Sequence, residues 1–224
     1  IDYNSVHIMF IYYVNNNYLS PIKLINEETG QINVDIAAGL SSNRYIAGIG
    51  FGAKNTDANI INKGVITVTS AAALSRSGAV GITGGGKNLI IDNRGTVSVT
   101  ALEGNQAVGI ETFGAWSNGT VSINNSGTIT VSGKAAANTF GMVAGTSKLT
   151  TSAQVVNSGT VELEGGTDLS EHRSAIYFDA SNVSIPLIFE NALTGVVMAD
   201  DFSYVVALDS DDSNTSAVHI TNSG

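Results

Sequence analysis

Apolar and polar residues alternate along most of this chain, in short segments that return at a nearly constant interval. The segment Gly95-Thr96-Val97-Ser98-Val99 is a clear example, with Val97 and Val99 on one side and hydroxyl residues on the other. Alternation with a period of two residues is typical of a strand that buries one face. No segment has the 3.6-residue period of an amphipathic helix, so the pattern predicts an all-β protein.

The interval is marked by the phrase Asn-x-Gly before the alternating segment. Looser copies surround Asn26 and Asn191, and a further copy begins at Asn222. In the four best copies the asparagines are Asn62, Asn93, Asn125 and Asn157, and the glycines Gly64, Gly95, Gly127 and Gly159 lie 31, 32 and 32 residues apart. A fixed period of this length is the signature of a solenoid, in which each repeat packs on its neighbours.

Each repeat contains three strand-like segments. The first follows the Gly, the second centres on phrases such as Val80-Gly81-Ile82, Phe140-Gly141-Met142 and Ile176-Tyr177-Phe178, and the third ends at the next Asn. This organisation predicts a parallel β-helix with three strands per rung over residues 22–224, right-handed by the rule for parallel crossovers. Residues 1–21 are expected to form an N-terminal strand or cap, and the chain to be part of a longer protein.

The repeated Asn has the same parity as the inward Ile or Val before it, so we expect it to point into a corner of the coil. Stacked asparagine amides form hydrogen-bonded ladders between successive strands. We therefore assign the Asn a structural role. The Gly two residues later is expected to adopt a positive φ in a sharp turn.

The second segment is expected to expose small residues on its outer face. These residues are Gly48, Gly81, Gly109 and Gly141. A low-profile β surface would allow a second rod to approach closely, so lateral self-association is one hypothesis for this face. The alternative interpretation is that small residues simply suit a tight coil.

Composition excludes several function classes. The net charge is −9, which disfavours nucleic acid and anionic membrane surfaces as partners. There is no Cys, and therefore no disulfide framework or thiolate metal site. No apolar run is long enough for a transmembrane helix. The sequence indicates no cofactor: Gly81–Asn88 resembles a phosphate-binding loop, but it continues into a strand where that loop needs a helix.

The phrases Asn125-Ser126-Gly127-Thr128-Ile129-Thr130-Val131 and Asn157–Leu163, with Gln106–Ile110, resemble the passenger domains of Gram-negative autotransporters. The resemblance covers roughly residues 22–224. It implies a secreted or cell-surface β-helix that is anchored to the outer membrane through a segment absent from this sequence. It specifies the fold more closely than any one activity.

A carbohydrate-active enzyme on this fold would need carboxylates on one outer face. The outer column of the second segment is predicted as Thr83, Glu111, Val143, Asp179 and Asp209, which makes Asp179 and Asp209 rung neighbours and candidate catalytic residues. The acidic run that contains Asp209, Asp211 and Asp212 is a candidate Ca²⁺ site, although it lacks the Gly and distal Glu of an EF-hand loop. A chance pair and a solvated turn are the favoured interpretations.

We therefore expect a structural or adhesive rod rather than an enzyme. Its partner would be a surface glycan, a protein of a host or neighbouring cell, or another copy of itself. The expected contact segments are the variable loops 69–78, 100–106, 132–138 and 164–174, because a solenoid can change its loops without breaking its core. A homopolymeric extracellular filament is the first alternative, and a polysaccharide-degrading enzyme is the second.

Overall fold

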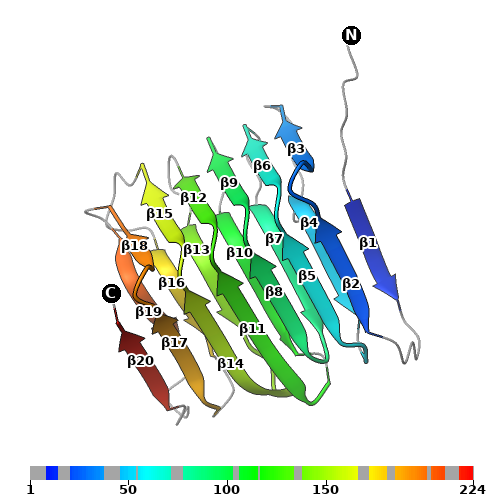
Figure 1. Ribbon diagram of the computed structural model, residues 1–224, viewed down its shortest axis with the longest axis vertical. Coiled ribbons are helices and arrows are strands. Elements are labelled where there is room, and N and C mark those ends of the chain that lie inside the picture. Colours follow the sequence, from blue (N-terminus) through cyan, green and yellow to red (C-terminus); the bar gives the residue numbers. More distant parts are fainter. Residues whose placement is uncertain are drawn as a thin grey trace.

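The computed structural model describes residues 9–14, 21–37, 46–53, 55–71, 78–102, 106–115, 117–133, 138–165, 172–180, 185–200, 203–209 and 217–223. For Met9–Val14 and Ala53 only the backbone is described. Every regular element in these ranges is a β-strand, and all the strand pairs are parallel. The strands form three sheets that wrap into one coil, as Figure 1 shows.

The chain visits the three sheets in a fixed order, and each sheet gains one strand per turn. Sheet A contains β1 (Met9–Val14), β4 (Ile46–Ala53), β7 (Ala79–Gly86), β10 (Gln106–Ala115), β13 (Asn138–Gly145), β16 (Arg173–Asp179) and β19 (Tyr204–Asp209). Sheet B contains β2 (Ile22–Asn26), β5 (Ala58–Asn62), β8 (Leu89–Asn93), β11 (Gly119–Asn125), β14 (Thr150–Asn157), β17 (Leu187–Asn191) and β20 (Val218–Asn222). Sheet C contains β3 (Gln31–Ile36), β6 (Val65–Ser70), β9 (Thr96–Ala101), β12 (Thr128–Gly133), β15 (Thr160–Glu164) and β18 (Val196–Met198).

This arrangement confirms the predicted parallel β-solenoid with three strands per rung. Equivalent residues of successive repeats pair directly: Ile129 of β12 pairs with Val97 of β9 and with Val161 of β15. The N-terminal strand β1 pairs in parallel with β4 and therefore belongs to sheet A. Residues 9–14 thus continue the coil.

The core fills the interior of the coil with aliphatic columns from all three sheets. The alternation in sheets B and C matches the predicted parity, because Ile91, Ile123, Val97 and Ile129 are fully buried. Each such residue contacts equivalent residues in the rungs above and below, so the core is continuous along the axis.

The strands of sheet A bend at the glycines that we expected to form a flat outer surface. That expectation is wrong for Gly48, Gly81, Gly109 and Gly141. A Cβ built on Gly109 would lie 2.4 Å from Cγ2 of Ile129, a side chain of the core. The glycine and the residue after it both face inward, and at these four positions a side chain would collide with a core side chain of sheet C. These glycines therefore offer no surface for lateral packing.

The two C-terminal repeats have no Gly at this bend, which shifts the predicted alignment by two residues. Ile176 pairs with Met142 and Val206, so Ala175 occupies the place of Gly141. Tyr177, rather than Asp179, therefore follows Val143 in the outer column. Asp179 pairs instead with Gly145 and with Asp209.

Candidate functional site

The corner between sheets B and C holds a column of stacked asparagines. Each Nδ2 donates to Oδ1 of the Asn in the next rung, over distances of 2.8–3.0 Å. Most of these side chains are buried, and their amides also donate to backbone oxygens, as Asn125 does to O of Thr160. We call this column the asparagine ladder: Asn26, Asn62, Asn93, Asn125, Asn157, Asn191 and Asn222. Because its polar groups bond to one another, the ladder is part of the scaffold.

The glycines after the ladder are required for a different reason from the one we predicted. The only described glycines with a positive φ are Gly114 and Gly165. A Cβ on Gly127 would instead lie 2.0 Å from the carbonyl O of Gly95 in the preceding rung. Gly64, Gly95 and Gly159 have the same close contact with the rung before them. The turns stack so tightly that a side chain would separate the rungs.

The outer side of sheet A carries a second apolar cluster, separate from the core. It consists of Ala47, Val80, Val108, Phe140 and Val143, with Tyr177 packed against it. We call it the outer cluster. Its residues occupy adjacent rungs, and the rings of Phe140 and Tyr177 lie with their centroids 4.7 Å apart.

Two polar groups lie beside the outer cluster without hydrogen-bond partners. Oγ1 of Thr83 and Oε2 of Glu111 are both buried and unpaired, and the two residues are paired neighbours in β7 and β10. Burial, and then the charge of Asp179, raises the pKa of Glu111 to about 8. Glu111 therefore carries a proton at neutral pH, because a buried carboxylate without a partner is strongly disfavoured.

The outer cluster ends toward β19 at an open hollow of about 430 Å³. Three aromatic residues, Phe140, Tyr177 and Tyr204, line it together with Asp209 and His172. The hydroxyl of Tyr177 donates to Oδ2 of Asp209 over 3.1 Å. Burial, followed by the charge of Asp209, raises the pKa of Tyr177 above its usual range, so this hydroxyl stays protonated and keeps donating.

The candidate catalytic residues Asp179 and Asp209 are register neighbours on β16 and β19. Asp209 lines the hollow, whereas Asp179 lies one rung away. The candidate metal residues Asp211 and Asp212 lie outside the described residues. Among the residues that the structure does describe, no three His, Asp or Glu side chains are placed to hold a metal ion.

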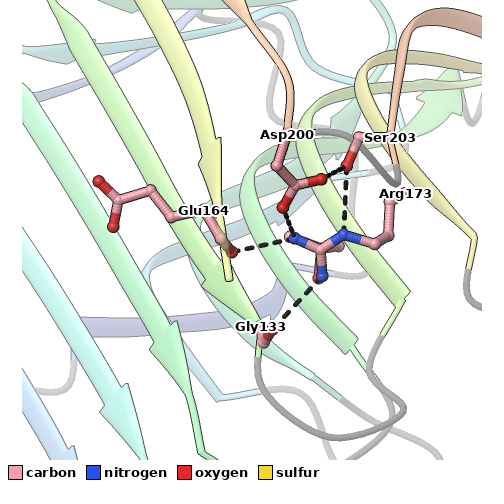
Figure 2. Close-up of polar contacts among 6 residues, drawn as sticks. Gly133, Glu164, Arg173, Asp200 and Ser203 are labelled. Atoms are coloured by element: carbon pink, nitrogen blue, oxygen red, sulfur yellow. Dashed lines mark hydrogen bonds and ion pairs between the residues drawn. The ribbon is translucent and has the colours of Figure 1, made fainter. Parts of the chain in front are cut away.

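Sequence reasoning missed the most connected polar side chain, Arg173. It lies inside the corner between sheets C and A and is 1% exposed. Its guanidinium donates to the carbonyls of Gly133 and Glu164, at 3.3 and 2.9 Å, and to Oγ1 of Thr139 at 2.9 Å. Figure 2 shows the contacts with Asp200 and Ser203 on the turn before β19.

The contacts of Arg173 connect three rungs. Gly133 ends β12, Glu164 ends β15, and Asp200 lies on the turn after β18, so one side chain binds the ends of two neighbouring strands of sheet C and the turn that follows the third. The ion pair with Asp200 spans 2.9 Å. We call this network the Arg173 corner; like the ladder, it is a structural element.

Most of the predicted contact loops cannot be placed, because 72–77, 103–105, 134–137 and 166–171 lie outside the described residues. In the part of the chain that is described, no helix is long and apolar enough to cross a membrane. No protein-family model, curated protein or solved structure matches this chain. The resemblance to autotransporter passengers therefore stays a prediction from the repeat phrases.

Proposed function

We propose that this chain is a rod-like segment of an extracellular structural or adhesive protein, and that it binds its ligand in the hollow at the end of the outer cluster. The asparagine ladder and the Arg173 corner are committed to contacts within the coil. The hollow differs, because it gathers Phe140, Tyr177 and Tyr204 around a carboxylate. Aromatic side chains beside a polar group are typical of recognition sites.

The observation that carries this proposal is the lining of the hollow, in which Tyr177 and Tyr204 lie with Asp209. The hydroxyl of Tyr177 donates to Oδ2 of Asp209, so the carboxylate is held beside the rings. Aromatic side chains that combine an apolar ring with a polar tip are typical of binding sites. The aromatic residues supply contact area, and Asp209 supplies charge and direction.

The proposal is tested by binding of the purified chain to arrays of surface glycans and matrix proteins. Tyr204→Ala should abolish binding to whichever ligand the native chain retains. Leu193→Ala is the matched control, because Leu193 is also an exposed apolar residue but lies on the turn between β17 and β18. Equal loss in both variants, or retention in both, would contradict a site at the hollow.

A polysaccharide-degrading enzyme is the second candidate. It is favoured by the pairing of Asp179 with Asp209, because neighbouring strands lie ~4.8 Å apart and retaining glycosidases hold two carboxyls about 5–5.5 Å apart. Turnover of a panel of polysaccharides, measured for the native chain and Asp179→Asn, decides between the two. Turnover that disappears in Asp179→Asn would favour the enzyme.

A further inference from the structure

The lining of the hollow defines a class of ligand more closely than adhesion in general. Its lining includes three aromatic rings and one carboxylate, that of Asp209, together with His172 and Arg173. The guanidinium of Arg173 is fully buried and paired with Asp200, so its charge is compensated within the coil. An aromatic ring presents a negative face, so several rings around one space attract a cation. A carboxylate at the rim adds to that attraction, and the net charge of −9 acts in the same direction.

The same lining disfavours a primary ammonium such as that of lysine. A primary ammonium is strongly hydrated, and ring faces cannot replace the hydrogen bonds that its three N–H donors make with water. One oxygen of Asp209 already accepts the hydroxyl of Tyr177, and the hydroxyl of Ser174 bonds to the backbone oxygen of Ile176. A quaternary ammonium has no N–H donors, so rings and a single carboxylate are sufficient for it.

We propose that the hollow lined by Phe140, Tyr177, Tyr204 and Asp209 binds the quaternary ammonium group of a choline headgroup. Tyr204 and Tyr177 contact the methylated nitrogen with their rings, and Asp209 faces its charge. Phe140 packs behind Tyr177 and holds that ring in position. This inference rests on the proposed function, since it names the chemistry of the ligand that the same site would hold.

The experiment is titration calorimetry of the whole chain with choline chloride. Dimethylbutanol, the neutral carbon isostere of choline, serves as the matched probe because it has the same shape without the charge. We expect choline to bind about five- to thirtyfold more tightly than the isostere, as for a cation beside aromatic rings. Equal affinity of the two probes, or no binding of either, would overturn the inference.

Two pairs of variants locate the binding. Tyr204→Leu should weaken choline binding about fivefold or more, whereas Tyr204→Phe keeps the ring and should bind as the native chain does. Asp209→Asn should weaken it, whereas Glu190→Gln removes one charge from the outer face of sheet B and should not. Tyr204 and Asp209 are both exposed, so these variants should fold. Equal effects within either pair would place binding elsewhere.

The choline result and the adhesion result are independent. A chain that adheres to a surface through Tyr204 but does not distinguish choline from its isostere would contradict the quaternary ammonium site and leave the adhesive role standing. A chain that binds choline through Tyr204 but retains no surface ligand would contradict the adhesive role alone.

Discussion

In two corners of the coil, buried polar side chains find their hydrogen-bond partners in different ways. In the corner between sheets B and C, every rung supplies the same residue, and the asparagines bond to one another. In the corner between sheets C and A, the paired inward residues run Ile46, Ala79, Ala107, Thr139 and Arg173, so each rung is nearly unique. Arg173 bonds to the ends of two strands of sheet C, to Thr139 of sheet A and to the turn after β18. A polar residue that repeats in every rung can bond to its own copies, whereas a polar residue that occurs once needs hydrogen-bond partners from several distant segments.

The largest effect is expected from Arg173→Leu. The change leaves the carboxylate of Asp200 and the carbonyls of Gly133 and Glu164 without their donor. Removing one partner of a buried ion pair costs about 3–5 kcal/mol of unfolding free energy, measured by urea denaturation. Arg94→Leu is the control, because Arg94 forms an exposed ion pair with Asp92, and its loss should change stability little. Similar losses of unfolding free energy in the two variants would show that the Arg173 corner stabilises the coil no more than an exposed ion pair does.

Glu111 provides a second unique polar residue, and its effect depends on pH. Its pKa is raised to about 8 in the folded chain, so the folded state holds this proton more tightly than the unfolded state. The stabilisation is therefore complete below the unfolded value and is lost as pH rises through the folded value. Between about pH 4.5 and pH 8 we expect a loss of a few kcal/mol of unfolding free energy.

Urea unfolding at several pH values checks this expectation. Glu111→Gln should abolish the loss, because the amide does not ionise. Thr83→Val removes the neighbouring unpaired hydroxyl but keeps the carboxyl, so its stability should still fall with pH. If Glu111→Gln retained the fall, another group would have to be responsible.

The two kinds of corner also explain how much of the molecule could be predicted. The ladder and the columns of sheets B and C follow from a period that the sequence displays many times. The role of Arg173 does not, because no repeated phrase connects it with Gly133 or Asp200, which lie 40 and 27 residues away. The hollow was missed for a related reason. The alignment that placed Asp179 after Val143 relied on a Gly that the last repeats lack, so it matched Tyr177 with Gly141 instead of with Val143.

Within the ladder, the contribution of an asparagine to the unfolding free energy should depend on how deeply it is buried. Asn125→Ala breaks the bonds to Asn93 and Asn157 and leaves their buried groups partly unpaired. We expect a loss of about 2–3 kcal/mol in unfolding free energy. Asn222→Ala should cost less in this chain, because Asn222 is exposed and water can hydrate the groups that remain. Equal losses in urea titrations would show that the ladder does not act through burial.

The smallest effect is expected at the glycines of sheet A, and it separates a packing surface from a bend. In Gly109→Ala the new methyl would lie 2.4 Å from Cγ2 of Ile129 and 2.5 Å from the carbonyl O of Gly141, so the neighbouring rungs must shift. Overpacking of this kind costs about 1–3 kcal/mol. Gly50→Ala is the matched control, because its methyl would meet only Thr83 and Ala47, at 3.8 and 3.9 Å. A destabilised Gly109→Ala beside an unchanged Gly50→Ala assigns these glycines to the inside of the coil. The opposite result, a stable Gly109→Ala that alters self-association on a sizing column, would show that these glycines form a packing surface.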